Sequence, residues 1–156
     1  MIQRVQSIYL FFASFFYFLY WFFGYNWYEK GFAFFHQKLF ASGDVNVLHI
    51  LFYVTSCIPL VISIISLISI FLFKKRSFQI KLTNLSFYLS VFMAIYSAFY
   101  FSITLLYLAN LIDSTVIEIL LYAAILNPFI CCYLLYAAIK KIKKDEDLIN
   151  SINRIR

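Results

Sequence analysis

The sequence is poor in charged residues, which make up 13% of it, whereas an ordinary soluble domain has about 25%. Its mean hydropathy is +0.86, and long apolar runs account for this value. Glycine (3) and proline (2) are also scarce, whereas Phe (20) and Tyr (13) are abundant. An AT-rich coding sequence explains that bias as readily as a special aromatic role does. The composition excludes an ordinary soluble protein and predicts a membrane protein.

Cysteine is rare, and its three positions do not suit redox chemistry. A membrane thiol oxidoreductase needs a Cys-x-x-Cys motif or an exposed pair at the oxidising face. Here Cys131 and Cys132 are adjacent and point to different faces of one span, and Cys57 lies in another span. We interpret all three as small apolar side chains that fill the interior.

Histidine is rarer still, with two residues in the chain. Haem held between helices needs two inward imidazoles at matched depth, but His36 lies in a connection and His49 only begins a span. A zinc site of both histidines with Glu29 and Asp44 has no recognisable spacing. We therefore expect no metal, no cofactor and no catalytic residue.

Long apolar runs are what the sequence does contain. Four of them are long enough to cross a bilayer as helices, since about 20 residues suffice. They predict an all-α bundle of four transmembrane helices in a single domain, residues 1–156, with no room for a separate soluble catalytic domain. The expected spans are residues 7–28, 47–73, 82–108 and 114–139, followed by a tail, 140–156.

The basic residues indicate the orientation of these spans. Eleven of the 13 Lys and Arg residues lie at the amino end, in the connection between the second and third spans, or in the tail. Because cationic flanks stay in the cytoplasm, both termini are predicted to be cytoplasmic. The first span has no small-x-small cleavage site before Trp27 and Tyr28, so we interpret it as a retained anchor.

Polar groups within the spans are few. The deep parts of the spans contain no ionisable residue, and Glu118 lies near an end, so a pump or coupled transporter is not predicted. Pro59 and Pro128 should kink their helices. The Asn127 amide should form a hydrogen bond across the bundle.

Small residues recur every four positions in the third span, which places them on one helix face. Such a face lets another backbone approach closely, either within the bundle or from a partner protein. The second span has a weaker counterpart in Ser63, Ser66 and Ser69. The residues of the third span are Ser86, Ser90, Ala94, Ala98 and Ser102.

The tail combines a basic collar, Lys140 to Lys144, with an amphipathic stretch. If it is helical, Leu148, Ile149 and Ile152 share one side, which predicts a short amphipathic C-terminal helix. This helix could lie on the membrane, continue the fourth span or dock on a partner. The acidic run 145–147 counts against a purely lipid-binding role and favours a protein contact.

Both ends of the chain also resemble a known family. The opening MIQRVQSIYL and the closing KKDEDL, with Ser151, Arg154 and Arg156, are similar to an uncharacterised family of small four-span membrane proteins of Gram-negative bacteria (domain of unknown function 4293). The span interiors match it only in hydrophobicity, and they are unusually rich in Phe and Tyr. The resemblance implies a bacterial inner-membrane protein and no activity, cofactor or catalytic residue.

We predict a non-enzymatic accessory or scaffold subunit of a membrane complex, which contacts membrane lipids and another membrane or membrane-associated protein through its cytoplasmic ends. The alternative is an oligomeric channel or small-solute transporter lined by the serine stripes. The basic charge is placed at membrane flanks, so nucleic acid is not an expected partner. The predicted partner-binding residues are Gln3, Arg4, Gln6, Lys143, Lys144, Asp145, Glu146, Leu148, Ile152, Arg154 and Arg156.

Overall fold

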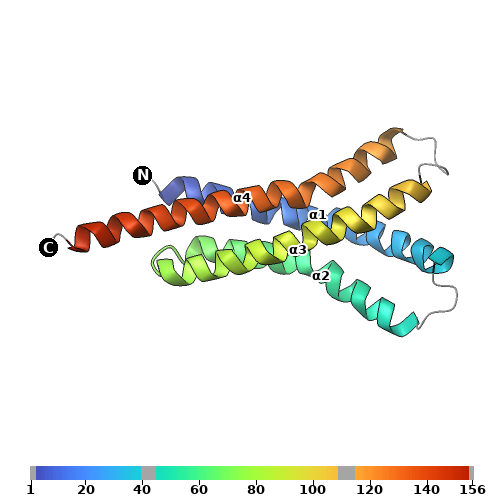
Figure 1. Ribbon diagram of the computed structural model, residues 1–156, viewed down its shortest axis with the longest axis horizontal. Coiled ribbons are helices and arrows are strands. Elements are labelled where there is room, and N and C mark those ends of the chain that lie inside the picture. Colours follow the sequence, from blue (N-terminus) through green and yellow to red (C-terminus); the bar gives the residue numbers. More distant parts are fainter. Residues whose placement is uncertain (1–2, 40–44, 109–114, 155–156) are drawn as a thin grey trace.

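The computed structural model describes the backbone of residues 3–39, 45–108 and 115–154, and the side chains of residues 5–23, 53, 55–99, 119, 122–149 and 151. These residues form four α-helices (Figure 1). The helices are α1 (Gln3–Leu39), α2 (Val45–Phe71), α3 (Arg76–Leu108) and α4 (Thr115–Arg154).

Three of the helices contain a described stretch that is long and apolar enough to cross a membrane. These stretches are Val5–Phe23, Arg76–Phe99 and Tyr122–Ile149. The described apolar part of α2, Thr55–Phe71, is shorter. Three to four apolar helices fit a multi-pass membrane protein.

Each helix packs against its neighbours in sequence, and α4 closes the ring by packing against α1. The chain is therefore an antiparallel, up-and-down four-helix bundle. The start of α1, the turn between α2 and α3, and the last part of α4 lie at the same end of the bundle, which we call the terminal end (Figure 1). At that turn the carbonyl of Lys75 accepts hydrogen bonds from the backbone N–H groups of Phe78 and Gln79, which starts α3.

The core follows a heptad pattern, in which buried positions alternate three and four residues apart. One position from each helix forms a layer, and hydrogen bonds between Gln79 and Ser69 and between Tyr17 and Ser90 fix the register. Counted from the terminal end, the layers are Gln6, Ser69, Gln79 and Ile142; Leu10, Ser66, Thr83 and Ala138; Ala13, Ile62, Ser86 and Leu135; Tyr17, Pro59, Ser90 and Cys131; and Tyr20, Thr55, Met93 and Pro128.

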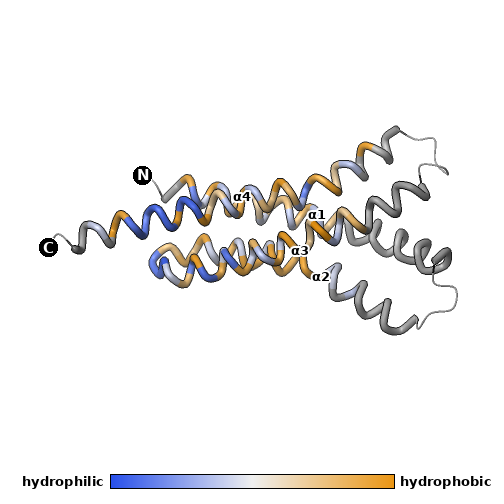
Figure 2. Tube along the Cα trace, viewed as in Figure 1, coloured by the Kyte–Doolittle hydropathy of each residue, from blue (hydrophilic) through white to orange (hydrophobic). Residues whose placement is uncertain are grey.

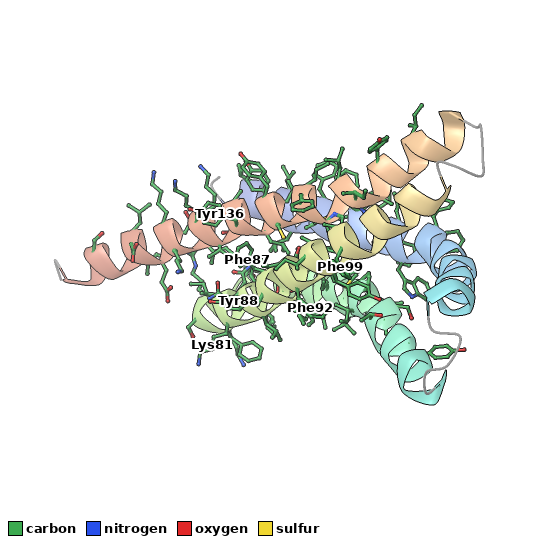
Figure 3. All side chains as sticks on the ribbon, turned by 45° about the vertical axis from the view of Figure 1, so that its right-hand side comes forward. Lys81, Phe87, Tyr88, Phe92, Phe99 and Tyr136 are labelled. Atoms are coloured by element: carbon green, nitrogen blue, oxygen red, sulfur yellow. The ribbon has the colours of Figure 1, made fainter. Side chains whose placement is uncertain are left out.

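The outer surface of the bundle is more apolar than its core. Large aromatic side chains are exposed along α3 and α4, among them Tyr88, Phe92, Phe99 and Tyr136 (Figure 3). Figure 2 shows hydrophobic residues along the helices, with hydrophilic ones gathered at the α2–α3 turn and in the last part of α4. This distribution suits a bundle surrounded by lipid, because lipid tails solvate apolar side chains as well as a protein core does.

Of the arrangements considered for the tail, the structure has the one in which the tail continues the fourth span. Helix α4 runs without a break through Pro128 and the basic collar to Arg154. It extends beyond the start of α1 and the α2–α3 turn (Figure 1). The fourth span and the tail are therefore one helix. The backbone hydrogen bonds of the part inside the bundle continue into the tail.

Candidate functional site

Helices α1 and α2 are joined by a reciprocal pair of serines. The Ser14 hydroxyl donates to the carbonyl of Ser63 (2.9 Å), and the Ser63 hydroxyl lies 3.0 Å from the carbonyl of Ser14. The two Oγ atoms are 3.1 Å apart. Both residues are buried. Side-chain hydroxyls can reach the opposite backbone only where two helices approach closely, so this contact depends on the small size of serine.

A second polar cluster crosses the middle of the bundle. The Tyr17 hydroxyl of α1 is hydrogen-bonded to the Ser90 hydroxyl of α3. Ser90 Oγ also lies 3.1 Å from the sulfur of Cys132 in α4. Ser90 therefore connects three of the four helices. Tyr17 has no exposed surface, so its hydroxyl needs a partner of this kind.

Asn127 makes the cross-bundle contact expected of an amide in an apolar helix. Its side-chain nitrogen donates to the carbonyl of Phe16 in α1 at 3.2 Å. Its oxygen accepts a weaker contact from the Cys131 thiol, with sulfur and oxygen 3.6 Å apart. The bond to Phe16 satisfies the amide and joins α4 to α1.

The predicted packing stripe faces the bundle interior over the part whose side chains are described. Ser86, Ser90 and Ala94 are buried, and Ala98 is half-buried. Ser102 lies outside the described side chains. The weaker stripe of α2, residues Ser63, Ser66 and Ser69, is buried as well.

Five described side chains place oxygen atoms in the interior with no hydrogen-bond partner in the protein. Two are hydroxyls in the second and third core layers, and three lie at the terminal end. The atoms are Oγ of Ser66 and Ser86, Oε1 of Gln6 and Gln79, and Oδ2 of Asp145. Gln6 and Asp145 are among the residues predicted to contact a partner at a cytoplasmic surface. Their positions in the heptad pattern are the signal that places them inside.

The cysteines are free thiols, with Cys131 buried and Cys57 exposed on the outer face of α2. No group of three His, Cys, Asp or Glu residues that could hold a metal ion occurs among the described residues. The side chains of Glu29, His36 and His49 lie outside the described part, as does Asp44.

The predicted partner-binding residues separate into two groups by exposure. Gln6 and Asp145 are 2% and 5% exposed, so their side chains face the bundle interior. Lys143, Lys144, Leu148 and Ile149 are exposed and Glu146 is half-exposed. Lys144, Leu148 and Ile149 lie on one side of α4 and form what we call the α4 docking surface, with Glu146 beside Ile149 and Lys143 on the opposite side. The side chains of Gln3, Arg4, Ile152, Arg154 and Arg156 lie outside the described part.

Comparison with known proteins supplies a family for this bundle and nothing about its activity. A family model described as a domain of unknown function (DUF4293) matches residues 2–155. This match confirms the resemblance seen at the two ends of the sequence. No curated protein and no solved structure matches the chain.

Proposed function

Because the chain belongs to this DUF4293 family, which brings no activity with it, we propose a function from the geometry: a non-catalytic accessory or scaffold subunit of a membrane complex. It contacts its partner through the α4 docking surface. The observation that carries this proposal is the exposure of Leu148 (46%) and Ile149 (41%) on a helix that extends beyond its own bundle.

The docking surface continues the packing stripe of α4. Ile142 and Asp145 occupy successive buried heptad positions, and Ile149 follows Asp145 by four residues, at the next position of the same stripe. Inside the bundle this stripe packs against α1 and α3. Beyond the bundle, Leu148 and Ile149 form an apolar seam that is available to another helix. This supports a partner that presents an amphipathic helix.

A second copy of the chain fits this surface poorly. Two copies side by side in one membrane would present their α4 helices in parallel, which sets Glu146 of one copy near Glu146 of the other. Like charges at such a seam oppose pairing. A different protein that offers basic residues beside its apolar seam avoids this repulsion.

The channel alternative is less well supported. An oligomeric pore lined by the serine stripes needs those serines on the outer face of each bundle. The described serines of both stripes instead lie inside one bundle, where Ser63 and Ser90 are engaged by Ser14 and Tyr17. The outer face carries aromatic side chains, which suit lipid.

We place the protein in the inner membrane of a bacterium, with both termini in the cytoplasm and with lipids around the bundle. The concentration of lysines and arginines at the terminal end supports this orientation. To test it, Ser151, which is exposed, is replaced by cysteine in a variant without the native cysteines. An impermeant maleimide should label Ser151→Cys in inside-out vesicles and not in right-side-out vesicles. The opposite pattern contradicts the orientation.

The proposed contact is tested by purifying the full chain from native membranes in mild detergent. The comparison is a variant with Leu148→Ser and Ile149→Ser, which removes the apolar seam and leaves Asp145 and the core in place. We expect recovery of a stoichiometric partner to fall about tenfold or more, because buried apolar anchors carry most of the energy of such contacts.

The matched control is Asp147→Asn, which changes an exposed neighbour outside this seam and should leave recovery unchanged. If the Leu148 and Ile149 variant retains the partner as well as the native chain does, the α4 docking surface is not the contact. If the native chain is recovered alone, the accessory role itself is contradicted.

A further inference from the structure

The terminal end of the core contains an unusual group of acceptor oxygens. Oε1 of Gln6, Oε1 of Gln79 and Oδ2 of Asp145 have no hydrogen-bond partner among the residues that the structure describes. Their residues are 2%, 0% and 5% exposed. Buried acceptors are almost always paired, so three at one end of a core indicate that something else supplies the donors or the positive charge.

These three residues come from three helices and belong to neighbouring levels of the bundle. Gln6 and Gln79 are the first buried positions among the described side chains of α1 and α3, and Asp145 follows the first-layer residue Ile142 of α4 by three positions. Side chains of α1 and α3 meet across this core, as the bond between Tyr17 and Ser90 demonstrates.

Helix geometry leans the three side chains toward the same level of the bundle. The Cα–Cβ bonds of a helix tilt toward its N-terminus. Gln6 and Gln79 lie near the starts of α1 and α3, so their side chains lean outward, toward the terminal end. Asp145 lies near the end of α4, so its side chain leans inward. The Gln79 amide nitrogen is held by the carbonyl of Ser69 at 2.9 Å, which leaves its oxygen as the free acceptor.

The chemistry of this group favours a cation. Water could satisfy the two amide oxygens, whereas a cation would satisfy them and also pair with the Asp145 carboxylate. Carboxylate and amide oxygens are ligands for hard cations. A single carboxylate gives the site one negative charge, and the nearby lysines at 140, 141, 143 and 144 oppose a divalent ion.

We propose that Gln6, Gln79 and Asp145 form a binding site for a monovalent metal cation, Na⁺ or K⁺, at the terminal end of the bundle. The ion joins α1, α3 and α4 where α4 leaves the core. The site lies in the first core layer and just outside it, so it does not depend on the α4 docking surface.

The test measures thermal unfolding of the full chain in mild detergent at matched ionic strength. Na⁺, K⁺ and Mg²⁺ are each compared with N-methylglucamine, which is too large for the site. We expect Na⁺ or K⁺ to raise the unfolding temperature in a saturable way by about 3 °C or more. The increase should disappear in Asp145→Asn and persist in Asp147→Asn, which alters a neighbouring exposed carboxylate.

Two further measurements keep the proposal testable if Asp145→Asn does not fold. The first is the unfolding temperature of Gln79→Leu, which should no longer rise with Na⁺ or K⁺. The second is the ²³Na resonance of a Na⁺ solution, which should broaden when the native protein is added. If K⁺ shares the site, added K⁺ should narrow that resonance again. Equal unfolding temperatures in all salts, or an equal increase in Asp145→Asn, overturn the proposal. Stabilisation by Mg²⁺ alone contradicts the assignment to a monovalent ion.

Discussion

Replacing Ser63 with leucine is expected to lower the free energy of unfolding of the bundle by about 2–4 kcal/mol. Ser63 is 3% exposed and faces Ser14 across the contact between α1 and α2. Leucine cannot occupy this space without separating the two backbones, and overpacking of this kind costs about 1–3 kcal/mol. The hydrogen bond from Ser63 to the carbonyl of Ser14 is also lost, at about 0.6 kcal/mol.

Two control variants separate size from hydrogen bonding. Ser63→Ala removes the hydroxyl without adding volume, and it should cost only about 0.5–1 kcal/mol. Ile64→Leu changes the next residue, which is 47% exposed, and should cost less than about 0.5 kcal/mol. The measurement is reversible unfolding in mixed micelles with increasing denaturing detergent. Equal costs for Ser63→Leu and Ser63→Ala would show that close approach of α1 and α2 is not what the serine provides.

Truncation of Leu135 to alanine is expected to cost about 1–3 kcal/mol. Leu135 has no exposed surface and lies in the third core layer. A comparable change in a soluble core costs about 2–5 kcal/mol, part of which is the transfer of the side chain from water. In a membrane that part is largely absent, because lipid is as apolar as leucine. What remains is the cavity and the lost contacts.

The same substitution at Leu126 is the matched control, since this residue lies on the same helix and is 56% exposed. Leu126→Ala should cost less than about 0.5 kcal/mol, because lipid fills the space that the side chain leaves. Unfolding of both variants in the mixed micelles used for Ser63 gives the comparison. If the two leucines cost the same, α4 does not present the Leu135 face to the bundle.

Much of the fold could be predicted from the sequence, because long apolar runs are a strong signal for membrane helices. The ends of the helices were less predictable. The first span was expected to end at residue 28, but α1 continues to Leu39, and α3 begins at Arg76 rather than at residue 82. A charged residue interrupts an apolar run, but the backbone hydrogen bonds of the helix can continue through it. Hydropathy therefore underestimates the length of helices that extend beyond the apolar zone.

The candidate site was predictable where it depends on spacing within one helix. The four-residue period of α3 identified Ser86 and Ser90 as packing residues. The contact of Ser90 with Tyr17 could not be predicted, because the two residues lie in different helices and are 73 positions apart in sequence. Gln6 and Asp145 were predicted to lie at a cytoplasmic surface, because both ends of the chain carry the flanking charge. In the structure each occupies a buried heptad position of its helix.

The continuity of α4 also determines how far its docking surface stands from the lipid. Lys140 is the first charged residue after the apolar part of α4, and Leu148 follows it by eight residues, or about 12 Å along a helix. The headgroup region on one side of a bilayer is about 5–8 Å thick. Even with a tilt of about 20°, the rise from Lys140 to Leu148 remains about 11 Å. On the function proposed above, a partner therefore reaches this surface from the aqueous phase without any segment of its own in the membrane.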